Sequence, residues 1–311
     1  MAVHIVRKSS ELSFEAPDEF RGRSAGYSRD EVVNEERGAT QMGFAVARLE
    51  PDGHTETHVH SWEESLYVIE GNLTVDTTEG SYLLNPGDYG LLPVGMSHGF
   101  RNLASTTAVF AEMKAPLPRK RFGYDTQFPG QSPVDRPMPV DVRDPRNRYF
   151  GHIDPENMDP KLQTQDRLAL SASMRTALLV YSGISVKMMI DSDLGADLST
   201  MFMVQYKQGG FAGAHDHPLE ETYLILEGSV EARFDGETYQ LSPGDVAWAG
   251  VGCVHEFRNI GDGVVRWLET QAPQPPPRHS YRFARDWIYL EGIVGDEITN
   301  TDDLVEKGNK T

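Results

Sequence analysis

The sequence predicts an all-β protein of two tandem antiparallel barrels with few, short helices. Two observations predict this class. The chain of 311 residues contains an internal repeat, and each copy consists of short apolar runs separated by turn residues. The copies lack long segments with helical periodicity, and many short strands at regular spacing are typical of a sandwich or a small barrel.

The repeat relates residues 58–103 to residues 215–260 at a constant offset of 157 positions, without a gap. The two segments share 17 identical residues among 46 aligned positions. The identical set is selective, because most of its members are His, Glu, Gly, Asp or Asn, which bind metals or form turns. A duplication of this kind predicts two copies of one structural module.

The strands of each copy are predicted from apolar runs and the turns that end them. Residues 66–69 (LYVI) and 223–226 (YLIL) are apolar, and a Gly-Asn or Gly-Ser pair follows each run as a hairpin signal. Two further turns are predicted by Pro-Gly-Asp at residues 86–88 and 243–245. The pattern therefore predicts a series of β-hairpins in each copy.

The segments around the repeat differ from it in composition. Residues 115–147 are rich in proline, which predicts an extended surface connection. We expect an N-terminal barrel with an N-terminal arm at residues 1–118, a linker or lid at 119–174, a second barrel at 175–285, and a polar tail at 286–311.

Composition limits the possible partners and location. The formal net charge of −18 disfavours binding to nucleic acid or anionic lipid, and no apolar run reaches the roughly 20 residues that span a bilayer. Cys253 is the only cysteine, so the chain cannot form an intramolecular disulfide. We expect a cytoplasmic protein whose partner is a small molecule, with no nucleic acid and no membrane.

Each copy carries a set of metal-ligand residues. Alternation along a strand places His58 and His60 on one face, Glu64 follows across a turn, and His98 comes from a downstream strand that must lie beside the first. The second copy repeats the set at His215, His217, Glu221 and His255. Three imidazoles and a carboxylate suit Fe(II), Mn(II), Zn(II), Ni(II) or Co(II), so we predict a divalent transition metal in each copy.

These spacings resemble the two sequence motifs of the cupin superfamily. The first copy reads Gly53-x4-His58-x-His60-x3-Glu64-x6-Gly71 and Gly87-x5-Pro93-x-Gly95-x2-His98-x3-Asn102. The second copy reads Gly209-x5-His215-x-His217-x3-Glu221-x6-Gly228 and Gly244-x5-Gly250-x-Gly252-x2-His255-x3-Asn259. The spacer after Gly53 is one residue short, and Gly250 stands where the family usually has proline. The resemblance covers about half of the chain and implies a bicupin, with two antiparallel jelly-roll barrels that each hold a metal at the centre.

The resemblance leaves several functions open. Bicupin dioxygenases such as flavonol dioxygenases use the same three-His-one-Glu set. This similarity favours Fe(II) and oxidation of a small enol, phenol or hydroxy acid, with Glu64 or Glu221 as ligand and catalytic base. Non-redox chemistry at a Mn(II)-type centre, namely hydrolysis, deamination or isomerisation, is the main alternative. Cupin barrels commonly exchange flanking strands, which implies a homo-oligomer.

Three narrower similarities are weakened by departures from the family patterns. Ureidoglycine aminohydrolases have Glu, His, His and Gln as ligands in their second module, which differs from this chain. Oxalate decarboxylases carry an arginine shortly before the His pair, where this chain has Thr-Glu-Thr at residues 55–57 and Ala-Gly-Ala at 212–214. Non-catalytic bicupins that store, sense or bind sugars form the last class, and storage relatives usually lose the ligands that this chain keeps.

Residues beside the ligands allow two interpretations each. Glu63 and Glu220 are interpreted as exposed strand-end carboxylates, with hydrogen bonding to a ligand imidazole as the alternative. Cys253 either lines the second pocket or is a buried, inert thiol. Trp62 and Trp248 are candidates for pocket walls, and core or interface packing is the alternative.

Overall fold

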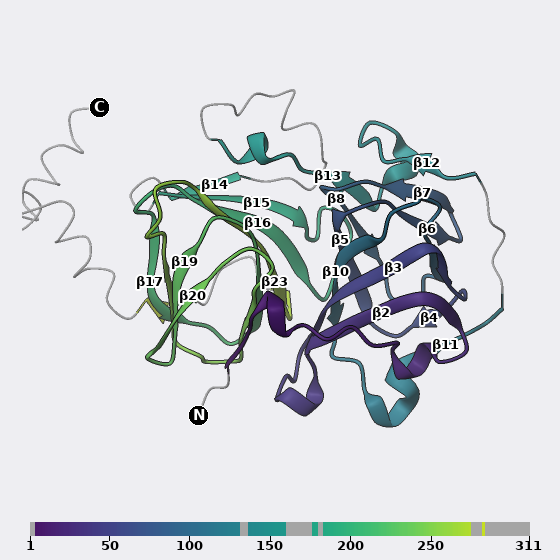
Figure 1. The fold of residues 1–311 in the computed structure, drawn as a ribbon, viewed down its shortest axis with the longest axis horizontal. Coiled ribbons are helices and arrows are strands. Elements are labelled where there is room, and N and C mark those ends of the chain that lie inside the picture. Colours follow the sequence, from purple (N-terminus) through teal and green to yellow (C-terminus); the bar gives the residue numbers. More distant parts are fainter. Residues whose placement is uncertain (1–3, 131–135, 160–175, 180–182, 275–281, 284–311) are drawn as a thin grey trace, which may run out of the picture.

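Two strand-built lobes lie side by side along the longest axis of the molecule (Figure 1). The structure is a computed structural model and describes residues 4–130, 136–159, 176–179, 183–274 and 282–283. The expected all-β class with two barrels is confirmed. Helix in the described residues is limited to short 3₁₀ turns at Ser9–Glu11, Asp18–Phe20, Glu35–Arg37, Lys120–Asp125, Pro145–Asn147 and Pro155–Met158.

The strands of the first lobe form a large sheet and a short two-stranded ribbon. The sheet contains β2 (Ser24–Val33), β3 (Gly43–Thr55), β5 (Glu63–Glu70), β6 (Leu73–Thr77), β7 (Gly80–Leu84), β8 (Asp88–Leu92), β9 (His98–Arg101), β10 (Ala108–Ala115), β12 (Met138–Pro139) and β13 (Phe150–His152). The ribbon pairs β4 (Val59–His60) with β11 (Thr126–Gln127).

The second lobe is built from two sheets. One contains β1 (His4–Arg7), β21 (Val246–Ala249), β18 (Glu220–Glu227), β23 (Val265–Ala272), β16 (Thr200–Tyr206), β15 (Ile184–Ile190) and β14 (Thr176–Leu179). The other contains β20 (Glu237–Leu241), β19 (Val230–Phe234), β22 (His255–Arg258), β17 (Phe211–Asp216) and β24 (Arg282–Phe283).

The repeated glycines at the predicted hairpins have a steric cause. Gly71 ends β5 with a φ of 70°, and Gly228 ends β18 with a φ of 72°. A Cβ atom would lie 2.3 Å from the carbonyl oxygen of Thr107 at the first turn and 2.2 Å from that of Val264 at the second. Only glycine fits both the left-handed backbone and the close approach.

The motif asparagines are structural. The Asn102 amide donates to the carbonyl oxygens of Leu49 and Thr106, both at 2.8 Å, and its oxygen accepts from the Ala104 N–H at 2.9 Å. Asn259 makes the equivalent contacts in the second lobe. A buried asparagine thus closes the loop that follows the last motif strand of each copy.

Each barrel gains an edge strand from outside the repeat. β1 pairs with β21, so the N-terminal arm belongs to the second barrel and not to the expected 1–118 unit (Figure 1). β13 pairs with β8, so part of the expected 119–174 linker belongs to the first barrel. The Pro-Gly-Asp turns anchor both strands, because Asp245 accepts from the Ser9 N–H at 2.8 Å and Asp88 contacts His152 Nδ1 at 2.7 Å. Pairing across long sequence distances is invisible to local patterns.

His152 makes the stability of the first barrel sensitive to pH. Its Nδ1 contacts Asp88 and its Nε2 lies 3.1 Å from an Asp154 oxygen. The hydrogen bond to Asp88, assisted by Asp154, raises the pKa of His152 to about 9. A raised pKa means that this pair stabilises the fold fully below the unfolded value of about 6.5 and that the contribution is lost as pH rises through about 9.

We therefore expect His152→Gln to destabilise the protein at about pH 6 and to have little effect at about pH 10. Urea unfolding of wild type and variant measures the change in unfolding free energy at both pH values. Groups that titrate in the same way in both proteins do not contribute to this change. The exposed histidine His54, replaced by Gln, is the control. An equal loss of stability at both pH values would contradict the ion-pair explanation.

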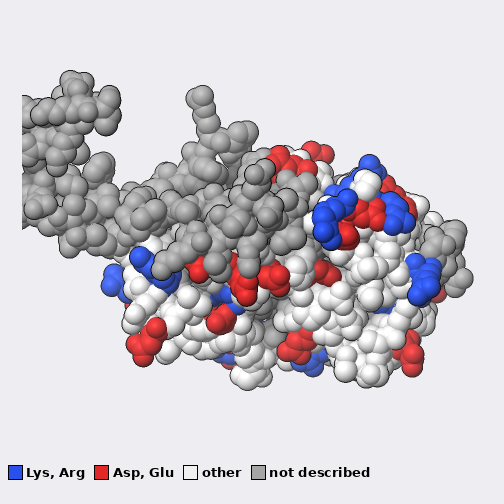
Figure 2. Space-filling view, turned by 90° about the horizontal axis from the view of Figure 1, so that it is seen from above, with Lys and Arg blue, Asp and Glu red and all other residues white. Residues whose placement is uncertain are grey.

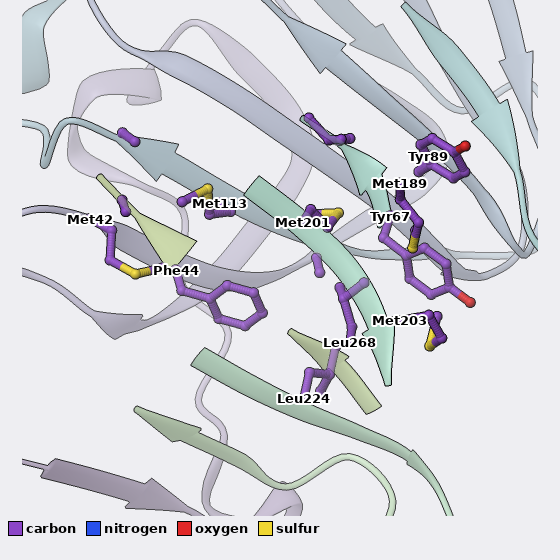
Figure 3. Close-up of a cluster of buried hydrophobic side chains, with 14 of the residues drawn as sticks. Met42, Phe44, Tyr67, Tyr89, Met113, Met189, Met201, Met203, Leu224 and Leu268 are labelled. Atoms are coloured by element: carbon purple, nitrogen blue, oxygen red, sulfur yellow. The ribbon is translucent and has the colours of Figure 1, made fainter. Parts of the chain in front are cut away.

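The two lobes share one apolar core. Figure 3 shows side chains from both lobes meeting in it. The first lobe contributes Met42, Phe44 and Met113, and the second contributes Met201, Met203, Leu224 and Leu268. Met189 belongs to the same cluster, and so does Trp248. Because this cluster of buried apolar side chains is shared, the two lobes form one packed unit.

Two buried glutamates clamp the lobes together at this core. Glu63 of the first lobe accepts hydrogen bonds of 2.6–3.0 Å from residues 197–199 of the second lobe. Glu220 of the second lobe accepts bonds of 2.8–3.2 Å from residues 40–42 of the first. Both carboxylates are buried, so their interpretation as exposed strand-end groups is wrong. Alternation of side chains along β5 and β18 places these two residues on the outer face of their own barrel, and the opposite lobe packs on that face.

No helix in the described part of the chain is long and apolar enough to cross a membrane. Figure 2 shows Lys and Arg side chains beside Asp and Glu side chains on one face of the molecule. Exposed ion pairs such as Arg148–Glu79 and Arg143–Asp141 are examples of this mixing. Exposed pairs of this kind contribute little to stability.

Candidate metal centres

Neighbouring strands of the first barrel bring one predicted ligand set together. His60 is the last residue of β4, Glu64 is the second residue of β5, and His98 is the first residue of β9. The backbones of His58 and His98 exchange two hydrogen bonds, of 2.8 and 2.9 Å, which hold their ring centroids 4.1 Å apart. One donor atom from each of these four side chains lies within 4.8 Å of the others, and all four residues are buried.

Each histidine of this cluster is oriented by its own backbone neighbourhood. The Nδ1 atoms lie 2.9 Å from the Glu56 oxygen for His58, 2.6 Å from the Trp62 oxygen for His60, and 2.9 Å from the Met96 oxygen for His98. A carbonyl oxygen only accepts, so Nδ1 carries the hydrogen in all three rings. Neutral rings of this tautomer keep the Nε2 lone pair for a metal.

The charge balance of the cluster fits a cation. Oε2 of Glu64 lies 3.2 Å from His60 Nε2 and 3.1 Å from His98 Nε2. Burial alone would raise the pKa of Glu64, but the contacts with His60 and His98 hold it well below its usual value. Burial lowers the pKa values of His58 and His60. A buried carboxylate beside three imidazole rings is an arrangement that a divalent metal stabilises.

The second barrel repeats this arrangement. The Nδ1 atoms of its histidines lie 2.8–2.9 Å from backbone oxygens, in the order His215 to Gly213, His217 to Leu219 and His255 to Cys253. The three imidazoles offer donor atoms within 4.8 Å of one another. Oε2 of Glu221 lies 2.8 Å from His217 Nε2 and 3.3 Å from His255 Nε2. The structure thus clusters the four predicted side chains of the first copy and the three histidines of the second, with Glu221 in contact with two of those histidines.

The two carboxylates differ in their other contacts. The Tyr223 hydroxyl donates to Oε2 of Glu221, and the Gln271 amide donates to Oε1. The offset of 157 places Leu66 and Lys114 at the equivalent positions of the first copy. Within the described residues, the polar contacts of Glu64 are those of Oε2 with the Nε2 atoms of His60 and His98. Glu221 is therefore fixed on both oxygens, whereas Glu64 keeps one oxygen for a further partner.

Aromatic side chains surround the first cluster. Phe20 meets the His58 ring edge to face at 4.8 Å, and Phe100 and Phe128 lie 5.9 and 6.1 Å from the same ring. Trp62 stacks on His60 at 3.4 Å with an interplanar angle of 5°. Of the two tryptophans considered as pocket walls, Trp62 stacks on His60, a predicted ligand, whereas Trp248 lies in the core between the lobes.

A buried charge network behind the first cluster was not predicted. Lys114 and Glu112 lie in β10, where Lys114 is the register partner of Glu64. Both are almost fully buried, and Lys114 bridges Glu112 and Glu31. Arg29 joins the same carboxylates from β2. The sequence signal was present, because Glu and Lys two positions apart in an apolar strand share the face that points into the barrel.

Two other features lie apart from the clusters. Trp62, Lys114 and Glu31 line a cavity of about 360 Å³ that none of the eight predicted ligands lines. Cys253 does not join the second cluster. Its side chain is buried, and burial together with Asp235 raises the pKa of the thiol to about 12. This supports the interpretation of Cys253 as a buried thiol over that of a pocket residue.

Comparisons with known proteins agree with this architecture. A family model described as "Cupin domain" matches residues 45–113 and 202–270. "Polyketide synthase CurC" from Streptomyces cyaneus is 31% identical over 106 residues, which cover 33% of this chain and 69% of that protein.

Two solved structures represent the similarity in fold. An oxalate decarboxylase from Lactobacillus farciminis, solved as a formate complex, has a TM-score of 0.61 and 18% identity, with 98% of this chain and 96% of that chain covered. A salicylate 1,2-dioxygenase from Pseudaminobacter salicylatoxidans has a TM-score of 0.64 and 15% identity, with 87% and 84% covered. At these identities the similarity concerns the fold.

Proposed function

This chain belongs to the cupin family and carries two cupin domains, and we propose that it is a metal-dependent dioxygenase of a small enol, phenol or hydroxy acid. The observation that carries the proposal is the first cluster. It offers three imidazoles and a carboxylate with one uncommitted oxygen. The names of two similar proteins, a salicylate dioxygenase and a polyketide synthase, support an oxygenated substrate.

We propose His58, His60, Glu64 and His98 as ligands of the metal at the catalytic centre, and His215, His217, Glu221 and His255 as ligands of a second metal. Fe(II) is the metal that this donor set and an oxidative reaction favour. When bound, Fe(II) would supply the redox activation of O2 and positive charge beside a substrate oxyanion. Nitrogen and carboxylate donors of this kind also accept Mn(II), Zn(II), Ni(II) or Co(II), which the test below distinguishes.

The residues of the first barrel would position and deprotonate the substrate. Phe20, Phe100 and Phe128 form an aromatic wall around His58, which suits a planar, unsaturated molecule. The free oxygen of Glu64 would accept the proton of the substrate hydroxyl group. Trp62 holds the plane of His60 through its stacking contact and donates its N–H to the Tyr124 oxygen at 3.0 Å.

The second barrel would serve a structural metal. Tyr223 and Gln271 occupy both oxygens of Glu221, so this carboxylate has less capacity to accept a substrate proton. Gln271 is in turn held by the Thr200 hydroxyl at 3.3 Å. The duplicated ligand sets would thus have different tasks, with catalysis assigned to the first.

The matched pair Glu64→Gln and Glu221→Gln tests this assignment. Glutamine keeps an oxygen ligand but removes the base, so Glu64→Gln should lower kcat by about 100-fold or more, while Glu221→Gln should lower it by less than about tenfold. Anaerobic purification, metal analysis by mass spectrometry and O2 uptake over enols, catechols and hydroxy acids provide the assay.

Three outcomes would contradict the proposal. Bound manganese or zinc without O2 uptake would indicate decarboxylation, hydrolysis or isomerisation. Absence of bound metal would indicate a non-catalytic binding protein. A larger loss of activity in Glu221→Gln than in Glu64→Gln would move the catalytic centre to the second barrel.

A further inference from the structure

A third group of metal-ligand side chains lies on the second lobe. It consists of His4 in β1, Asp235 in the turn between β19 and β20, and Cys253 in the loop before β22. One donor atom from each residue lies within 4.8 Å of the others. The group joins the N-terminal arm to two loops of the second barrel, and none of its members is one of the eight proposed ligands, although Cys253 lies two residues before His255.

Backbone contacts hold the carboxylate and the thiol of this group together. The Asp235 N–H donates to the Val254 oxygen at 2.8 Å, and the Val254 N–H donates to Oδ1 of Asp235 at 3.0 Å. This reciprocal pair joins the turn at residue 235 to the loop that carries Cys253. Cys253 is buried and Asp235 is exposed, so the group opens to solvent at its carboxylate side.

The third side chain is oriented by a relay of hydrogen bonds. The Tyr239 hydroxyl donates to Oε2 of Glu237 at 2.6 Å, so its oxygen accepts from Nε2–H of His4 at 2.9 Å. In this tautomer Nδ1 of His4 keeps a lone pair for a metal. The ring also stacks on Phe234 at 5.6 Å with an interplanar angle of 15°. Metal-binding histidines commonly have such an oxygen partner on the second nitrogen, which fixes the ring.

We propose that His4, Asp235 and Cys253 form a third metal site, selective for Zn(II) and similar borderline cations. Imidazole, carboxylate and thiolate are the donors that Zn(II) and Co(II) accept. On binding, the Cys253 S–H bond breaks, a sulfur–metal bond forms, and the proton leaves to solvent, because the charge of the cation offsets the burial and the Asp235 carboxylate that raise the pKa of the metal-free thiol. The site would add a further tie between the N-terminal arm and the second barrel, beside the pairing of β1 with β21 and the contact of Ser9 with Asp245. It does not depend on the reaction proposed above.

Cobalt binding distinguishes this site from the two central clusters. Only a thiolate ligand gives a sulfur-to-cobalt charge-transfer band in the near ultraviolet, the central clusters offer only nitrogen and oxygen, and the chain has one cysteine. Titration of the full chain with Co(II) should give this band, with a final intensity that corresponds to about one thiolate-bound Co(II) per chain because the two central clusters bind Co(II) without contributing to it, and Zn(II) should abolish the band. Cys253→Ser should remove the band.

Three further variants test His4, Asp235 and the tyrosine that orients His4, and they leave the buried thiol of Cys253 in place. His4→Ala and Asp235→Asn should each weaken Co(II) binding at the band by at least about tenfold, and Tyr239→Phe should weaken it by about 10- to 100-fold by freeing the His4 ring. The exposed His54, replaced by Ala, should leave the titration unchanged. Absence of the band in the folded wild type would overturn the site, as would an unchanged titration in both His4→Ala and Asp235→Asn.

Discussion

Replacing His58 and His60 together by alanine is expected to lower bound metal by about one equivalent per chain, and His215→Ala with His217→Ala is expected to lower it by another. Each pair supplies two of the four proposed ligands of its cluster, so neither cluster would retain enough donors to hold a divalent ion. The Nδ1 hydrogen bonds to backbone oxygens show that the rings are positioned in advance, which makes their Nε2 atoms the main source of affinity.

Mass spectrometry of the metals in purified wild type and variants measures this effect. The exposed His54→Ala variant should bind as much metal as wild type. Circular dichroism must show that each double variant is folded, because these histidines are buried. Unchanged metal content in both double variants would contradict the assignment of these histidines as metal ligands. Loss of O2 uptake only in the His58/His60 variant would further support catalysis in the first barrel.

The double variant Glu63→Ala with Glu220→Ala is expected to lose about 6 kcal/mol of unfolding free energy if the two contributions add, with about 3 kcal/mol from each single change. Each carboxylate accepts three or more hydrogen bonds from the opposite lobe, and removal leaves backbone N–H groups at the interface without acceptors. A loss of this size is a large part of the stability of a typical domain.

The same strands provide the control for this prediction. Glu70 ends β5 and Glu227 ends β18, and both are exposed. Their replacement by alanine should change stability by less than about 1 kcal/mol. Urea unfolding of the four single and two double variants gives the comparison. If the Glu63/Glu220 variant unfolds with a stability similar to that of the Glu70/Glu227 variant, the buried carboxylates do not hold the lobes together.

The sequence predicted those parts of the fold that depend on local pattern. The constant offset between the copies, the Gly71 and Gly228 turns, and the alternation of His58 with His60 each have a local physical cause, and the structure has two barrels with the ligand residues grouped as expected.

Contacts between distant segments were beyond such reasoning. Glu63 and Glu220 each precede a predicted ligand glutamate, so alternation places them on the outer face of their strand. Only the packing of the opposite lobe on that face shows that they are buried. The pairing of β1 with the second barrel has no local signal, since an edge strand pairs through backbone groups that every sequence has. Predicted segments at residues 160–175 and 286–311 lie outside the described residues.

The reciprocal clamp has a consequence for assembly. Adding 157 to residues 40–42 gives residues 197–199, and adding 157 to Glu63 gives Glu220, so the same contact occurs twice around a pseudo-two-fold axis. This is the isologous geometry of a homodimer, here enclosed within one polypeptide. A single module would expose an apolar face and a carboxylate whose complement is a second copy of itself. In the full chain that surface is already occupied, so any association between whole chains must use a different face.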